Sequence, residues 1–162
     1  MRKRTVPLDA NEALLVEALS SDARWLNVDT LATVEITSED SAHPIESALL
    51  PGRAPGWRAA GPGEQTIRLL FDLPQRLCHI HMQFSETGRE RTQEYVLRWS
   101  PDHGRSYREI VRQQWNFHPH GSTIETEDHR VELQDVTILE LNIVPDIAGG
   151  NAVASLAQLR LG

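Results

Sequence analysis

Apolar and polar residues alternate with a period of two along most of this chain, and that spacing predicts β-strands. Alternate positions of the run 77–84 form an apolar, inward set and a polar, outward set: Cys78, Ile80, Met82 and Phe84 against His79, His81 and Gln83. The run 136–144 divides in the same way: Leu139, Leu141 and Ile143 face inward, and Glu140 and Asn142 face outward.

Turn residues separate eight such runs, which predict eight strands: Leu31–Ser38, Thr66–Asp72, Leu77–Phe84, Glu94–Ser100, Ser106–Trp115, Ile124–Leu133, Val136–Val144 and Ala154–Leu161. One stretch, Asp9–Leu19, has helical spacing and a candidate N-cap in Asp9. About eight strands and one short N-terminal helix predict an all-β sandwich or barrel.

The clearest local pattern is a β-hairpin over Tyr95–Val111. Two runs with aromatic and β-branched residues flank the turn formers between Pro101 and Gly104. Pro101 presets φ for a turn, and Gly104 can adopt a left-handed conformation. We therefore expect two antiparallel strands joined by a loop of four or five residues.

Composition narrows the class of protein. A chain of 162 residues has the length of one domain that needs no disulfide or metal to fold. The single cysteine, Cys78, favours a reducing compartment. A formal net charge of −7 works against non-specific nucleic-acid binding. One lysine stands against 15 arginines, and either bidentate ligand contacts or a high-GC genome explains that bias.

The N-terminal segment does not predict export. Basic residues 2–4 are followed by Thr5–Glu12, which lacks the apolar core of a signal peptide. No window approaches 18 consecutive apolar residues, so no membrane-spanning helix is predicted. We expect a cytoplasmic protein with no membrane partner.

A resemblance to a known family rests on four pieces in a fixed order: an early tryptophan, a long strand ending near a proline, a "strand, Ser, x, Asp, x, Gly" hairpin and a closing strand. These are Trp57, Gly63–Leu77, Tyr95–Tyr107 and Ala154–Leu161. Together they are similar to the discoidin-like, galactose-binding-like β-sandwiches, which include coagulation-factor type C domains and bacterial carbohydrate-binding modules. The resemblance implies a jelly roll of two antiparallel sheets over residues 31–162, with ligand-binding loops at one end. Residues 1–30 would form an extension packed on that domain.

The chain departs from the family at its calcium-binding positions. Many members hold a structural calcium ion with an Asp-Gly-x-x-x-Thr segment before the early tryptophan and a glutamate in the closing strand. Here Pro51–Gly56 and Gln158 occupy those places. An amide is a poorer ligand than a carboxylate for a hard cation, so we expect no calcium and no other cofactor.

The residues 112–121 offer the best candidate binding site, because they combine aromatic, amide, guanidinium and imidazole groups in an expected loop. Sugars stack their apolar faces on aromatic rings while planar polar groups pair with hydroxyls. The candidate ligand-binding residues are Arg112, Trp115, Asn116 and His118, extended by Arg91 and Gln93 if these lie beside Trp115. The alternative is that Trp115 and Phe117 are buried loop anchors.

A second pattern, His79-x-His81 followed by Glu86, partly imitates the metal motif of cupins. A cupin directs its ligands into the barrel, whereas here the inward set is apolar, so two exposed polar residues are the favoured interpretation and no metal site is predicted. Nucleophile, P-loop and dinucleotide-binding motifs are absent from the sequence, and an enzyme is not expected.

These observations favour a non-catalytic module that binds a carbohydrate or similar polar ligand through the end loops. Two alternatives stay open: a protein-interaction or assembly module of the same fold, and a cupin-like metal-binding protein. A solvent-facing Trp115 would support sugar binding, and a broad apolar patch would support a protein partner. The sequence leaves the oligomeric state undecided.

Overall fold

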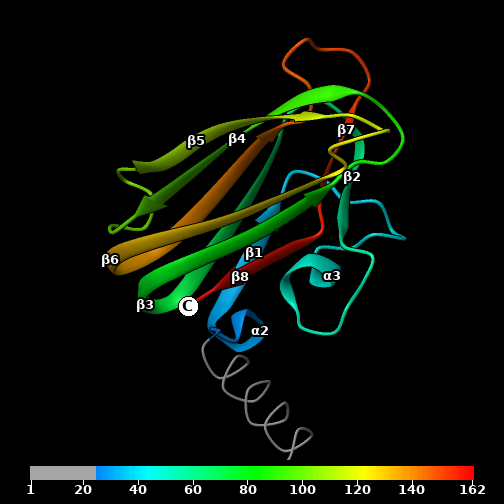
Figure 1. Ribbon diagram of the computed structural model, residues 1–162. Coiled ribbons are helices and arrows are strands. Elements are labelled where there is room, and N and C mark those ends of the chain that lie inside the picture. The colour runs from blue at the N-terminus through cyan, green and yellow to red at the C-terminus, as the bar shows by residue number, and fades with distance from the viewer. Residues whose placement is uncertain (1–24) are drawn as a thin grey trace, which may run out of the picture.

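β-strands dominate residues 25–162, the part of the chain that the computed structural model describes (Figure 1). Two one-turn helices accompany them, α2 (Val28–Leu31) before β1 and α3 (Glu46–Leu49) after it. The predicted all-β jelly-roll sandwich is confirmed, and the helix predicted over Asp9–Leu19 lies outside the described residues. The strands are β1 (Ala32–Ile36), β2 (Trp57–Pro62), β3 (Gln65–Ser85), β4 (Arg91–Ser100), β5 (Arg108–Phe117), β6 (Ile124–Val144), β7 (Val153–Leu156) and β8 (Gln158–Leu161).

The two longest strands, β3 and β6, take part in both layers of the sandwich. Residues 67–71 of β3 pair with β1, and residues 65–70 pair with residues 138–143 of β6, whereas residues 77–85 pair with residues 124–133 of β6. The register between these strands is interrupted from Leu70 to His79. Four runs expected as separate strands are therefore halves of two, because the turn residues around Pro74 bend β3 without ending it.

The core lies between the two layers. The main sheet has the order β1-β3-β6-β4-β5, with β8 paired to the second half of β3, and β2 and β7 form a ladder of their own. Figure 1 shows β3 and β6 passing from one layer to the other. Phe84 of β3 stacks on Tyr95 of β4 with ring centroids 5.3 Å apart, which joins the layers across the core. Burial raises the pKa of Tyr95, whose hydroxyl lies 2.8 Å from His129 Nε2.

The predicted alternation of faces holds for most of β3. Ile80, Met82 and Phe84 are fully buried, as expected. Cys78 is the exception: it is half-buried, and its neighbour Leu77 occupies the core. A register shift between residues 77 and 79 displaces the alternation by one residue at this point, as β-bulges do.

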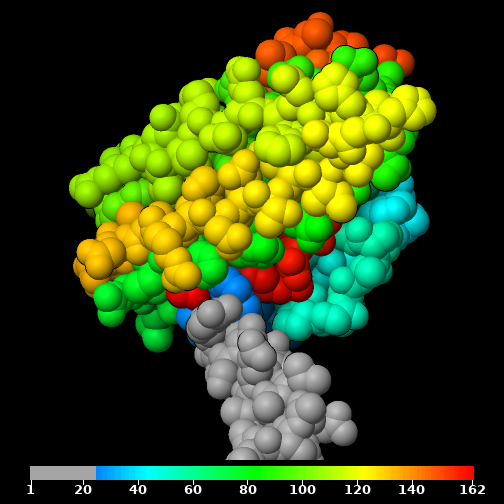
Figure 2. Space-filling model, viewed as in Figure 1, coloured from blue at the N-terminus to red at the C-terminus, as the bar shows by residue number. Residues whose placement is uncertain are grey.

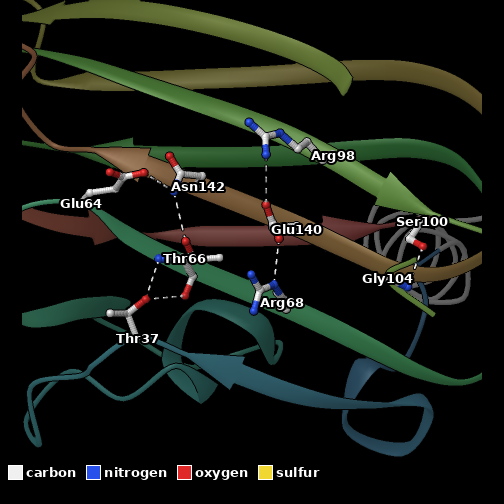
Figure 3. Close-up of polar contacts among 9 residues, drawn as sticks. All are labelled: Thr37, Glu64, Thr66, Arg68, Arg98, Ser100, Gly104, Glu140 and Asn142. Atoms are coloured by element: carbon white, nitrogen blue, oxygen red, sulfur yellow. Dashed lines mark hydrogen bonds and ion pairs between the residues drawn. The ribbon is translucent and has the colours of Figure 1, made fainter. Parts of the chain in front are cut away.

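The outer face of the first layer contains a buried ion-pair cluster. Leu139, Leu141 and Ile143 face inward as expected, but Glu140, expected to be exposed, is 6% exposed. Arg68 donates to Glu140 at 2.7 Å and Arg98 lies 3.9 Å from its other oxygen, so the two guanidinium groups cover the carboxylate (Figure 3).

The hairpin predicted over Tyr95–Val111 is present as β4 and β5, with a connection of residues 101–107 that is longer than expected. Asp102 organises this connection by accepting hydrogen bonds from the Ser106 and Ser100 hydroxyls, which lower the pKa of its carboxyl to about 2. Left-handed φ angles at His103 and Gly104 complete the reversal.

Two further details differ from the expectation. The early Trp57 begins a strand, β2, and the closing run splits at Ala157 into β7 and β8.

Before β1, Leu26 donates its N–H to the Leu161 carbonyl at 2.6 Å and Val28 enters the core, so the residues just before position 31 pack on the sandwich. None of the helices within residues 25–162 has the length and apolar character needed to cross a membrane.

Candidate functional site

The segment selected from the sequence as a binding loop is mostly strand. Residues 108–117 form β5, an edge strand paired with β4, and the loop begins only after Phe117. Neighbouring side chains on a strand point to opposite faces, so the six predicted site residues fall into two groups. Figure 2 shows that β5 and the first half of β6, in yellow-green to gold, cover much of one face of the molecule.

The outward group is exposed and paired within the protein. Arg112 donates to Glu94 at 2.6 Å, and the Thr92 hydroxyl donates to Asn116 Oδ1 at 2.6 Å. The hydrogen bonds that Glu94 accepts, from Gln114 and Arg112, lower its pKa. His118 follows the strand and is exposed. This group forms part of a polar sheet surface.

The inward group is Trp115, Gln93 and Arg91. Trp115 stands opposite Gln93 in the β4–β5 register, as the sequence hypothesis required for an extended site. Its ring is half-buried against the core, and its Nε1 is buried without a hydrogen-bond partner among residues 25–162. Most of the ring is turned toward the protein, so the solvent-facing tryptophan that would support sugar stacking is not found. The ligand-binding roles of both groups stay predictions.

Arg91 and Gln93 belong to a buried polar network with Glu86 and Glu125. Arg91, 3% exposed, donates from Nε to Glu86 Oε1 at 2.8 Å and from Nη1 to Gln93 Oε1 at 3.2 Å. Gln93 Nε2 in turn donates to Glu125 Oε1 at 3.3 Å. Glu125 is fully buried, and its Oε2 has no partner among the described residues. Desolvation, followed by the neighbouring Glu127, raises the pKa of Glu125 to about 8.

A different place brings exposed polar side chains together, and we call it the loop groove. It is an open cavity of about 570 Å³ where three segments meet: residues 43–58, the β3–β4 turn, and residues 151–157. Its lining residues are His43, Pro55, Trp57, Arg58, Ser85, Glu86, Thr87, Gly88, Arg89, Asn151, Val153, Ser155, Leu156 and Ala157.

Backbone contacts fix the first wall of the loop groove. Arg58 donates its N–H to the His43 carbonyl at 3.1 Å, and the Trp57 indole donates to the Ser38 carbonyl at 3.1 Å. Gly56 has φ +107°, and a Cβ there would lie 2.7 Å from the Leu156 carbonyl oxygen. Only glycine permits this approach, which seats the segment before Trp57 against the β7–β8 corner.

Glu86 and Arg91 fix the second wall. Glu86 Oε2 accepts the Gly88 N–H at 3.1 Å while Oε1 accepts from Arg91, so one carboxylate closes the turn and ties it to a buried guanidinium. On the third segment, the Ser155 hydroxyl donates to the Ser85 carbonyl at 3.3 Å. Arg58, Arg89 and Asn151 extend from these walls as exposed side chains.

His79 and His81 line a second groove, of about 740 Å³, whose lining does not include Glu86. Asp128 Oδ1 accepts hydrogen bonds from His79 Nε2 and His81 Nδ1, each 2.8 Å long, and these contacts lower the pKa of Asp128. The Trp25 ring lies 4.8 Å from that of His79. Within residues 25–162 no three His, Cys, Asp or Glu side chains are grouped so as to hold a metal ion.

The residues at the family's calcium position do not fit a calcium ion. Gln158 is neutral, and the neighbouring Arg160 sends its buried guanidinium to the carbonyls of Ala48 at 2.9 Å and Leu50 at 3.1 Å. A fixed positive charge on these oxygens disfavours a second cation beside them. Arg160 therefore ties the segment that precedes Pro51 to the closing strand.

Sequence reasoning overlooked the loop groove because its polar residues come from three segments that are far apart in the sequence. One available signal of a binding loop is the Pro-Gly-rich segment 51–56 before Trp57, which the sequence analysis considers only as the calcium position of the resembled family. The Asn after Gly149-Gly150 was a second signal of the same kind.

No protein-family model and no curated protein matches the sequence of this chain. Solved structures do match. The chain is similar to the family 32 carbohydrate-binding module of C. perfringens NanJ in complex with galactose, with 14% identity, a TM-score of 0.62 and coverage of 85% of this chain and 97% of that one.

Two other solved structures are similar to a comparable degree. A pectin-binding carbohydrate-binding module has 14% identity and a TM-score of 0.59, with coverage of 82% and 91%. The family 32 module of AlyQ in complex with 4,5-unsaturated mannuronic acid has 15% identity and a TM-score of 0.57, with coverage of 82% and 95%. At identities this low, the structural matches show the fold alone, and they confirm the galactose-binding-like β-sandwich predicted from the sequence.

Proposed function

We propose that this chain is a non-catalytic carbohydrate-binding module and that its ligand lies in the loop groove. The observation that carries the proposal is the convergence of exposed polar side chains from three distant segments on one open cavity of about 570 Å³. Cavities of that size accommodate small-molecule ligands, and open ones admit the end or a side of a longer chain.

The chemistry of the groove suits hydroxyl-rich ligands. Arg58 and Arg89 supply planar guanidinium donors, and Asn151 supplies a donor and an acceptor within one amide group. Such groups pair with neighbouring hydroxyls of a sugar ring. The similar solved structures support the same class of ligand, since they are a pectin-binding module and modules in complex with galactose and with 4,5-unsaturated mannuronic acid.

The acidic residues of the groove support binding without cleavage. Glycoside hydrolysis generally uses a pair of carboxyl groups on opposite sides of the scissile bond. Among the described lining residues Glu86 is the one acid, and its two oxygens are held by Arg91 and by the Gly88 N–H. A second carboxyl group to complete such a pair is not part of the lining.

A glycan array tests the proposal when it is run with variants of three regions. Arg58→Ala and Asn151→Ala alter the loop groove, Arg112→Ala alters the strand selected from the sequence, and Arg76→Ala is the matched control because Arg76 is exposed outside both. We expect wild type, R112A and R76A to bind the same glycans and the groove variants to lose binding.

Two results would count against this assignment. Binding that survives both groove substitutions but is lost in R112A would move the site to the outer face of β5. Absence of binding to every glycan would favour the protein-interaction alternative.

A further inference from the structure

The described lining of the loop groove offers no exposed tryptophan, tyrosine or phenylalanine ring for a sugar to stack on. Trp57 is its one tryptophan, tyrosine or phenylalanine among the described lining residues, and it is 1% exposed with its indole N–H turned to the Ser38 carbonyl. The apolar surface that remains accessible is small and aliphatic, chiefly Pro55 and Val153. Affinity in this groove must therefore come mainly from polar and ionic contacts.

The arginines of the groove differ in their partners from three arginines of the sheet surface. Arg68 and Arg98 are paired with Glu140 (Figure 3), and Arg112 is paired with Glu94. Within residues 25–162, no carboxylate lies within 4.0 Å of the guanidinium groups of Arg58 and Arg89.

The acid of the groove does not neutralise these two arginines. Glu86 is bound at 2.8 Å by Arg91, whose side chain is 1% exposed, so that this ion pair is internally balanced. The groove thus presents two uncompensated guanidinium groups on a chain whose formal net charge is −7. Because the protein as a whole is negatively charged, most of its surface repels an anionic ligand, whereas the local positive charge of the groove attracts one.

We propose that the loop groove is specific for acidic saccharides, in which a uronate carboxylate pairs with Arg58 or Arg89. The inference rests on the proposed carbohydrate-binding function and names its substrate class. A guanidinium group can pair with the planar uronate carboxylate through two parallel N–H···O bonds. Neighbouring hydroxyls then pair with groups such as Asn151.

The test compares one sugar backbone with and without its charge. Sodium oligogalacturonate and its fully methyl-esterified form are titrated into the full chain by calorimetry at 50 and 500 mM NaCl. We expect the ester to bind at least about tenfold more weakly, and high salt to weaken binding of the acid form but not of the ester. A neutral galacto-oligosaccharide and a sulfated galactan complete the ligand set.

Conservative variants locate the interaction. Arg58→Gln and Arg89→Gln keep hydrogen-bonding capacity without charge, and we expect the double variant to lose the preference for the acid form. Arg76→Gln is the matched control and should bind as wild type. Both groove arginines are exposed, so thermal unfolding of all variants should coincide with that of wild type.

The outcomes separate the two claims. Equal affinity for the acid and the ester, an acid preference that persists in the double variant, or equal binding of sulfated galactan would overturn uronate specificity. Binding of the neutral saccharide alone, lost on groove substitution, would overturn it and leave the proposed function intact. No binding of any saccharide would overturn both.

Discussion

The buried carboxyl group of Glu125 makes the stability of this domain depend on pH in a calculable way. Its pKa rises from an ordinary 4.5 to about 8 in the folded chain, because burial and Glu127 disfavour the charged form. Between these two values the folded chain holds a proton that the unfolded chain has released. Unfolding then releases that proton, so stability falls as pH rises, by up to about 1.4 kcal/mol per pH unit.

The magnitude follows from the same two pKa values. Their difference corresponds to roughly 5 kcal/mol at most between pH 4.5 and pH 8.5. Water admitted around the ionised group reduces this figure, and we expect at least about 2 kcal/mol. Glu125→Gln imitates the protonated carboxyl group and can still accept the Gln93 amide hydrogen bond. The variant should match wild type near pH 5 and exceed it by at least about 2 kcal/mol at pH 8.5.

Urea unfolding followed by tryptophan fluorescence, at half-unit steps from pH 5 to pH 8.5, measures this difference. Histidines and other titrating groups that do not interact with Glu125 contribute equally to both proteins, so their effects cancel in the comparison, whereas any change at Glu127 is part of the measured difference. Glu132→Gln is the matched control, since it removes an exposed carboxylate from the same strand and should give no pH-dependent difference. A difference between E125Q and wild type that stays constant with pH, or a variant less stable at pH 8.5, would refute the reasoning.

Three other predictions concern the scaffold. Arg160→Met should lower the free energy of unfolding by about 2–4 kcal/mol because three backbone carbonyls lose charged donors. Calcium or EDTA should leave the melting temperature of wild type unchanged, and a rise in that temperature with calcium would contradict the conclusion that these residues do not fit the ion. Asp102→Asn should lower the free energy of unfolding at pH 7, because the lowered pKa of Asp102 means that its ionised carboxylate stabilises the folded chain. Wild type loses this stabilisation as the pH falls toward about 2 and the variant has none to lose, so identical acid-unfolding curves would contradict the prediction. Trp115→Ala should cost about 2–4 kcal/mol in urea unfolding yet leave glycan binding intact, and lost binding at full stability would instead make Trp115 a ligand contact.

Local patterns predicted the scaffold well because strand alternation and turn chemistry act over a few residues. The hairpin of β4 and β5 follows from aromatic and β-branched runs around Pro101 and Gly104, and the inward set of β3 follows from period two. Cys78 departs because a bulge moves the alternation by one residue. Glu140 departs for a different reason: its burial is produced by Arg68 and Arg98 on neighbouring strands, and strand pairing is invisible to a local pattern.

The location of the binding site was harder to predict, because residues 112–121 were selected by their residue types alone, without knowledge of where their side chains point. Arg112, Trp115 and Asn116 have suitable chemistry, but strand geometry sends Trp115 inward and the other two outward. Arg91, which the sequence hypothesis included only if it lay beside Trp115, stands opposite Phe117 in the β4–β5 register and holds Glu86 at the wall of the loop groove from the interior. A list of residue types cannot separate a contact residue from the residue that positions it.

The excess of arginine illustrates what structure adds to composition. Fifteen arginines are equally compatible with ligand binding and with codon bias as long as only their number is known. Their partners divide them: Arg68 is paired on the sheet, whereas Arg58 and Arg89 have no carboxylate partner in the described chain. Absence of a partner is not sufficient, since exposed Arg76 also lacks one and stands outside the groove. An anionic ligand is indicated by the combination of unpaired charge with a concave site that lacks an exposed tryptophan, tyrosine or phenylalanine ring among its described lining residues. A guanidinium group in that setting attracts an anion by its charge and selects among anions by its geometry.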